Sequence, residues 1–281
     1  MTHAPTVVDA NGAHIPAIGL GTWPMKDDEC RIAVATALDL GYRHIDTAAM
    51  YGNEDAVGDG VRASSVDRDD VFVTTKVWPD NIRDGDLQRS AEASLERLGL
   101  DTVDLLLIHW PNREVSVREC IGALCDAKKR GLTRHIGISN FTTTLIDEAL
   151  AVTSEPLVCN QVEYHPNLNQ GALLKRCRQN GLAVVSYCPL GRGDVGGTMD
   201  EAVVKDIATT HGKTPGQIVL RWHVQQPGVV AVPKSANPER IAQNLAVFDF
   251  ALTEDEMAQL SALAKPDGRV VTNIAFAPDW D

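Results

Sequence analysis

The chain has 281 residues, of which 44% are hydrophobic and 23% are charged, and its formal net charge is −12. This composition is typical of a soluble globular protein whose core is large enough to need no disulfide or metal ion for stability. The acidic charge argues against nucleic-acid binding, which requires clustered Lys and Arg side chains, and no apolar stretch approaches the roughly 18 residues of a membrane-spanning helix.

The chain is expected to start with a β-hairpin and to continue as strand–helix units. Asn11-Gly12 is a turn signal between Val7-Val8 and His14-Ile15. Strands of a larger sheet are expected over residues 17–20, 43–46, 71–76, 103–109, 133–139, 157–161, 183–187 and 229–232. Amphipathic helices are expected over residues 27–40, 53–63, 85–98, 115–130, 142–151, 171–180, 199–211, 214–226, 238–247 and 253–263.

Eight strands that alternate with helices predict a parallel sheet closed into a (β/α)8 TIM barrel, with an N-terminal β-hairpin and extra helices. No linker of Pro and Ser interrupts the pattern, so residues 1–281 are expected to form a single barrel domain. The tail 267–281 is expected to be irregular and could fold over the barrel mouth.

Cysteine usage and the chain start bear on the compartment. None of the six cysteines forms a C-x-x-C pair, which is typical of buried, reduced thiols, and the first residues carry no basic-then-apolar signal. We therefore expect a cytoplasmic protein. The histidines lack the spacing of a metal site, so we expect no bound metal. The sequence contains no pattern of a large exposed apolar stripe, so we expect a monomer.

Polar residues come at or just past the ends of three consecutive predicted strands. These residues are Asp46, Tyr51, Lys76 and His109. The carboxyl ends of barrel strands converge on one face, so an acid, a phenol, an amine and an imidazole are expected to meet there. A neighbouring ammonium is expected to lower the pKa of the phenol, and a carboxylate would keep that ammonium charged. The alternative is a buried structural ion pair beside a tyrosine and a core histidine.

A second candidate site follows the last predicted barrel strand. Lys234 and Ser235 come directly before a predicted helix, and Arg240 lies one turn into it. A lysine, a hydroxyl and a helix N-terminus together make a phosphate site, and barrels often hold phosphate after strands seven and eight. The alternative is a helix cap at Asn237 with ordinary surface charge.

One motif is rejected as a dinucleotide fingerprint. Residues 191–196 match G-x-G-x-x-G after a strand, but residues 197–199 are expected to continue the loop. No strand ends in an acidic residue about 20 positions later, as that fingerprint requires.

The sequence resembles the aldo-keto reductases over nearly its whole length, from about residue 15. The resemblance lies in Asp46-Thr47-Ala48-x-x-Tyr51-Gly52-Asn53-Glu54, Lys76-Val77-Trp78, Leu107-Ile108-His109-Trp110-Pro111, Gly137-Ile138-Ser139-Asn140-Phe141, Asn160-Gln161-Val162-Glu163-Tyr164-His165-Pro166 and Val232-Pro233-Lys234-Ser235. The tail from Gly268 is similar to that of bacterial 2,5-diketo-D-gluconate reductases, some of which also reduce methylglyoxal.

The resemblance implies a (β/α)8 barrel that reduces small carbonyl compounds with NADPH. It implies that Tyr51 is the general acid, that Lys76 paired with Asp46 lowers its pKa, and that His109 orients the carbonyl group. The residues that it implies for cofactor binding are Ser139, Asn140, Gln161, Tyr187, Leu190, Lys234, Ser235, Arg240, Gln243 and Asn244. The residues that it implies for an apolar substrate pocket are Trp23, Trp78 and Trp110.

The chain departs from the family pattern in three places. Ala236-Asn237 follows Lys-Ser where Val-Thr is frequent, and Cys188 stands where serine is common. The short loop 112–115 predicts an open pocket with broad specificity. Two other functions stay open at this point, namely a nicotinamide-sensing binding subunit with little turnover and a non-redox barrel enzyme such as a sugar-phosphate isomerase.

Overall fold

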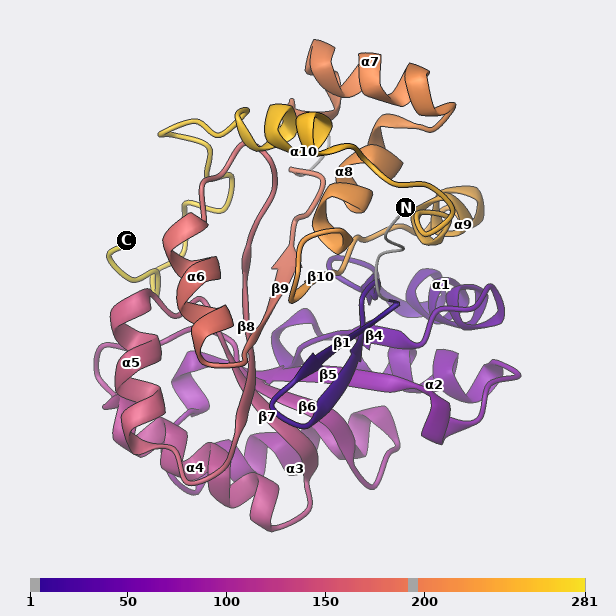
Figure 1. Cartoon of the computed structure of the whole chain (residues 1–281). Helices are drawn as coiled ribbons and strands as arrows, with labels where there is room; N and C mark the ends of the chain where they lie inside the picture. The colour runs from indigo at the N-terminus through magenta and orange to yellow at the C-terminus, as the bar shows by residue number, and fades with distance from the viewer. Residues whose placement is uncertain (1–5, 192–196, 281) are drawn as a thin grey trace.

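The computed structural model describes residues 6–191 and 197–280, and Figure 1 shows a ring of helices around a sheet. The sheet has eight parallel strands in chain order. They are β3 (Leu20–Gly21), β4 (His44–Asp46), β5 (Phe72–Val77), β6 (Val103–Ile108), β7 (Thr133–Ser139), β8 (Leu157–Glu163), β9 (Ala183–Tyr187) and β10 (Val229–Ala231). All residues of β6 and β8 are buried, as expected for parallel strands covered by helices.

Backbone hydrogen bonds between the first and last strands close the sheet into a barrel. Ile18 forms a parallel bridge with Ala231, and the N–H groups of Gly19 and Gly21 donate to the carbonyls of Ala231 and Pro233 at 2.9 and 3.0 Å. A Cβ atom on Gly21 would lie 2.7 Å from the carbonyl oxygen of Val232, so only glycine permits this close approach. The predicted (β/α)8 barrel is therefore confirmed.

The helices lie outside the strands and match the predicted order. They are α1 (Asp27–Asp39), α2 (Glu54–Ala63), α3 (Asp86–Leu98), α4 (Val117–Lys129), α5 (Thr143–Val152), α6 (Gly171–Gln179), α7 (Ala202–His211), α8 (Pro215–Val224), α9 (Pro238–Leu245) and α10 (Glu254–Ser261). Short 3-10 turns are η1 (Ala49–Tyr51), η2 (Arg68–Asp70), η3 (Pro79–Asn81) and η4 (Thr198–Asp200). Within the described ranges, no helix is both long and apolar enough to cross a membrane.

The predicted hairpin is present as β1 (Val7–Ala10) and β2 (Ala13–Pro16), which pair antiparallel. Asn11 and Gly12 adopt positive φ angles of 43° and 91°, as the turn requires. The Asn11 amide donates to the carbonyls of Leu157 and Asn180 at 2.8 and 3.0 Å. The hairpin is thereby bound to the start of β8 and the end of α6, away from the strand ends that carry the polar residues.

Several element boundaries differ from the sequence predictions. The first barrel strand, predicted over residues 17–20, is β3 at Leu20–Gly21, and Ile18 before it forms an isolated bridge. The helix predicted from residue 199 begins at Ala202, and the loop predicted over 197–199 is wrong at its end, because Thr198–Asp200 forms the 3-10 turn η4. The G-x-G-x-x-G match lies mostly over residues 192–196, outside the described residues.

Candidate active site

A pocket of about 1190 Å³ opens at the C-terminal ends of the barrel strands. Asp46, Tyr51 and His109 line one part of it, with Tyr187 at the end of β9. The loop after β10 contributes Lys234 and neighbouring residues to another part. Both candidate sites predicted from the sequence thus belong to a single pocket, on the barrel face where strand ends converge.

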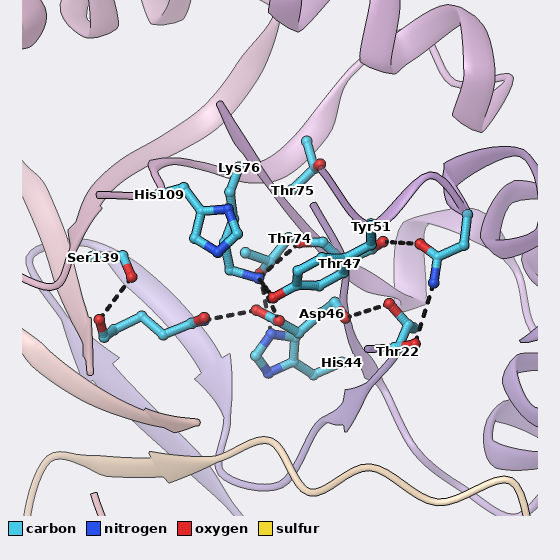
Figure 2. A network of polar contacts seen from close by, with 12 residues as sticks. Thr22, His44, Asp46, Thr47, Tyr51, Thr74, Thr75, Lys76, His109 and Ser139 are labelled. Carbon is cyan, nitrogen blue, oxygen red and sulfur yellow. Dashed lines mark hydrogen bonds and ion pairs between the residues drawn. The ribbon is translucent and has the colours of Figure 1, made fainter. Parts of the chain in front are cut away.

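Lys76 lies at the centre of a network of polar contacts beneath the first part of the pocket wall (Figure 2). Its side chain is 0% exposed, and its Nζ lies 2.6 Å from Asp46 Oδ1. The same Nζ donates to the Thr47 carbonyl at 2.8 Å and to the Tyr51 hydroxyl at 3.4 Å. An ammonium group has three protons, so each has an acceptor. The predicted meeting of carboxylate, ammonium and phenol is present in the structure.

The pKa of Tyr51 differs from the sequence-based expectation. Burial raises the pKa of the phenol, and this outweighs the lowering by the Lys76 ammonium, so the net direction is upward from 10.0. A net lowering was therefore the wrong prediction for the free protein. Burial alone would lower the pKa of Lys76, but Asp46 and Tyr51 outweigh burial and raise it. At neutral pH the pair is thus a neutral phenol beside an ammonium.

His109 follows β6 and faces the Tyr51 ring, with ring centroids 5.6 Å apart at an edge-on angle. Burial lowers the pKa of His109 well below 6.5, and the Lys76 charge lowers it further. The imidazole is therefore neutral at neutral pH and can donate one hydrogen bond. Its Nδ1 is buried without a hydrogen-bond partner in the described part of the chain.

Asn53 fixes the segment that carries Tyr51, and the sequence reasoning gave it no role. Its amide nitrogen donates to the carbonyls of Thr22 and Met25 at 3.2 and 2.9 Å. Its oxygen accepts from the Thr47 hydroxyl at 2.8 Å. Gly52, between Tyr51 and Asn53 in the chain, has a φ of 59°, and this left-handed conformation ends the turn η1. A polar residue directly after Tyr51-Gly52 was the available sequence signal.

The residues predicted to hold a nicotinamide group fall into two sets. Asn140 and Tyr187 line the pocket, and the Tyr187 hydroxyl donates to Asn140 Oδ1 at 2.8 Å. Ser139 and Gln161 are buried behind the wall, where the Ser139 hydroxyl donates to the Gln161 carbonyl at 2.8 Å. The Gln161 amide donates to Asp46 Oδ2 at 2.7 Å. In the free protein Gln161 therefore contacts the ion pair rather than the pocket.

The remaining predicted cofactor-binding residues, among them the three predicted for phosphate, line the other part of the pocket. This set consists of Leu190, Lys234, Ser235, Arg240, Gln243 and Asn244. The Asn237 side chain accepts from the Arg240 backbone N–H at 3.0 Å and caps α9. Lys205 of α7 also lines this part and pairs with Asp200 at 3.0 Å, which no sequence pattern indicated.

Lys234 and Arg240 form no ion pair with any described carboxylate, although acidic residues outnumber basic ones in the chain. Uncompensated cations beside a helix N-terminus suit an anionic group such as a nucleotide phosphate. The residues present therefore fit a phosphorylated cofactor at this end.

Two of the three predicted substrate-pocket tryptophans line the pocket. Trp23, which is 45% exposed, and Trp110 are on its wall. Trp78 is not among the lining residues, and its ring instead packs edge-on against His109 and Phe276, with centroids 5.2 and 5.8 Å apart. The barrel and the pocket together define a (β/α)8 protein of the enzyme type, with titratable groups at one end of the pocket and, at the other, Lys234 and Arg240, which have no ion-pair partner among the described residues.

Comparison with known proteins agrees with this class. The model of the aldo/keto reductase family matches residues 17–265. Methylglyoxal reductase DkgB of Escherichia coli O157:H7 is 42% identical over 270 residues, which cover 95% of this chain and 99% of that protein. The chain belongs to the aldo/keto reductase family.

Solved structures show the same likeness over the whole chain. A protein provisionally assigned as 2,5-diketo-D-gluconic acid reductase B has a TM-score of 0.93 and 45% identity, and the match covers 100% of this chain and 98% of that one. A Bombyx mori aldo-keto reductase in complex with NADP has a TM-score of 0.89 and 36% identity, with coverage of 100% and 98%.

Proposed function

We propose that this enzyme reduces small aldehydes, ketones and dicarbonyls to alcohols with NADPH, and that Tyr51 is the general acid. The observation that carries the proposal is the contact of Lys76 Nζ with both Asp46 Oδ1 and the Tyr51 hydroxyl, at 2.6 and 3.4 Å, beside a pocket with free cations. Methylglyoxal and 2,5-diketo-D-gluconic acid occur in the names of two similar proteins, so they are the first substrates to test.

Tyr51 and His109 would act on the carbonyl oxygen. The raised pKa of Tyr51 keeps the phenol protonated at neutral pH, which is the state that a proton donor needs. The neutral His109 imidazole would donate a hydrogen bond that orients the same oxygen. As Tyr51 gives up its proton, the Lys76 ammonium would stabilise the phenolate, and Asp46 keeps Lys76 charged.

NADPH would lie along the pocket and supplies the hydride when bound. Lys234, Ser235 and Arg240 would hold its 2′-phosphate, with Gln243 and Asn244 beside the adenine. Asn140 and Tyr187 would contact the nicotinamide, with Ser139 and Gln161 behind them, and Leu190 would pack against the cofactor.

The proposed activity is tested by following the loss of NADPH absorbance with methylglyoxal and with a panel of aldehydes. We expect NADPH consumption that depends on both the enzyme and the carbonyl compound. Quenching of tryptophan fluorescence by NADPH without turnover on any compound would favour a nicotinamide-sensing subunit. Neither quenching nor turnover would favour a non-redox barrel enzyme.

Replacing Arg240 with glutamine is expected to raise the KM for NADPH and hardly change the KM for NADH. A hydrogen bond to a charged group contributes roughly 1.5–3 kcal/mol, which corresponds to an increase of about tenfold to a hundredfold. Steady-state kinetics with both cofactors measure the effect. As a matched control, Arg89→Gln removes an exposed arginine of α3 that pairs with Asp86 of its own helix and should change neither KM. Equal losses with both cofactors would exclude a contact of Arg240 with the 2′-phosphate.

A further inference from the structure

A buried carboxylate outside the proposed proton-transfer groups binds the C-terminal tail. Glu163 is the last residue of β8, and its side chain is 0% exposed. Its two oxygens accept the backbone N–H groups of Val270 and Val271 at 2.6 and 3.1 Å. His165 Nε2 lies 3.1 Å from one oxygen, and the Arg269 guanidinium lies 3.6 Å from the other.

Glu163 stays charged despite its burial. Burial alone would raise its pKa, but the contact with His165, the Val270 N–H and the Arg269 charge lower the pKa of this carboxyl overall. A buried carboxylate is costly unless hydrogen bonds and an opposite charge satisfy it, and two of these bonds come from the tail backbone. The Glu163 carboxylate and the tail therefore stabilise each other, although Glu163 and Val270 are 107 residues apart in the sequence.

The bound tail forms part of the pocket wall. Val271 and Ile274 line the pocket directly. Behind them, Phe276 packs on Trp78, and Trp280 packs on Trp110 with ring centroids 6.1 Å apart. In Figure 1 the tail, drawn in yellow, leaves α10 and descends past α6. The tail thus contributes apolar side chains to the pocket wall and packs against Trp110, which lines the pocket, and against Trp78, which packs on His109.

The other charged contacts of the tail lie at the surface or within the tail itself. The pair of Arg113 with Asp279 is 73% and 98% exposed, and such pairs contribute about 0–1 kcal/mol. The Arg269 guanidinium stacks on Trp280 of the same tail, 3.6 Å from the ring centroid, and so orders the tail without joining it to the barrel. Among the charged groups described in the structure, Glu163 is the buried one that holds the tail backbone to the barrel.

We propose that Glu163 is a positioning residue for substrate recognition. By binding the backbone at Val270 and Val271, it places Val271 and Ile274 against the part of the substrate that lies beyond the carbonyl group. Glu163 thereby favours carbonyl compounds whose apolar substituent is long enough to contact the tail over carbonyl compounds whose substituent is too short to do so. This inference rests on the proposed carbonyl-reductase function.

The first test compares Glu163→Gln with the wild type on two aldehydes that differ by one phenyl ring, propanal and 3-phenylpropanal. Glutamine keeps the shape but removes the charge and one of the two acceptors. We expect the KM for 3-phenylpropanal to rise about tenfold, the order expected for losing a charged hydrogen bond. The KM for propanal, kcat for both aldehydes and the Kd for NADPH should change by less than about threefold.

The second test needs no turnover. Trypsin cleaves after arginine, and the bond after Arg269 leads to the N–H that Glu163 binds. Proteolysis follows the population of the open form, so cleavage there should be about tenfold faster in Glu163→Gln than in the wild type. Mass spectrometry of the released peptide 270–281 measures the rate.

Asp104→Asn is the matched control for general destabilisation. Asp104 is also a buried carboxylate that accepts a backbone N–H, from Val73 at 2.9 Å, and contacts Arg134, but it lies near the start of β6, away from the pocket. This variant should lose stability without faster cleavage after Arg269 and without a change in the ratio of the two KM values.

The outcomes separate the two proposals. Unchanged tail cleavage in Glu163→Gln, an equal KM increase for both aldehydes, or the same pattern in Asp104→Asn would overturn the role of Glu163. A wild-type enzyme that consumes no NADPH with any carbonyl compound would overturn the proposed function and the substrate role together. In that case the tryptic assay would still decide whether Glu163 holds the tail.

Discussion

Replacing Tyr51 with phenylalanine is expected to lower kcat for carbonyl reduction by about 10²–10⁴-fold, the usual contribution of a general acid. Phenylalanine keeps the ring that packs near Trp23 and His109, with centroids 5.2 and 5.6 Å away, but it has no proton to give. Lys76 keeps its contacts with Asp46 and Thr47 at 2.6 and 2.8 Å, so the fold should survive. Initial rates with methylglyoxal measure the loss.

NADPH binding should survive the same change, because the free cations lie at the other end of the pocket. Quenching of tryptophan fluorescence during an NADPH titration measures this binding. Tyr164→Phe is the matched control: its hydroxyl donates to Gln226 at 2.8 Å, away from the pocket, and its loss should leave kcat unchanged. A Tyr51→Phe enzyme that reduces methylglyoxal at nearly the wild-type rate would show that another group supplies the proton.

The meeting of Asp46, Lys76 and His109 was predictable from the sequence because it depends on strand topology, whereas Tyr51 is placed by the turn η1 that follows β4. Asp46, Lys76 and His109 end or follow consecutive parallel strands, and such strand ends converge in a barrel. The hairpin was predictable for a local reason, since Asn11-Gly12 suits the positive φ angles of the turn. Features set by strand order or by one dipeptide therefore need no knowledge of the packed structure.

The direction of the Tyr51 pKa shift was not predictable in the same way. The sequence indicated that an ammonium would lie near the phenol, and Lys76 does lower the pKa. The net shift is a balance between this charge and desolvation, and the larger desolvation effect depends on how completely the finished pocket encloses the ring. No spacing of residues carries that information.

Contacts between residues far apart in the chain could not be predicted from the sequence either. Glu163 lies in a motif that indicates the family, but its partners Val270 and Val271 contribute backbone N–H groups, which any residue would supply. Lys205 sits in an ordinary amphipathic helix, and only the packing of α7 brings it to the pocket. Ser139 and Gln161 lie behind the pocket wall because their polar groups find partners in the protein itself.

Replacing Lys76 with methionine is expected to reduce both stability and catalysis, for separable reasons. Asp46 would stay buried with Gln161 as its remaining side-chain partner, at 2.7 Å, and breaking a buried ion pair costs about 3–5 kcal/mol of unfolding free energy. Without the ammonium, the phenolate left by proton transfer loses its stabilising charge, so kcat should fall by about 10²–10³-fold. Urea denaturation and initial rates measure the two effects.

The double variant Asp46→Asn, Lys76→Met distinguishes these two effects. Replacing both members of a buried ion pair by neutral groups is often nearly neutral for stability, so most of the lost unfolding free energy should return. The kcat should not return, because the charge beside the Tyr51 hydroxyl, 3.4 Å from Lys76 Nζ in the wild type, is still missing. If kcat recovers together with stability, Lys76 serves the fold alone, and the proposed electrostatic support of Tyr51 must be abandoned.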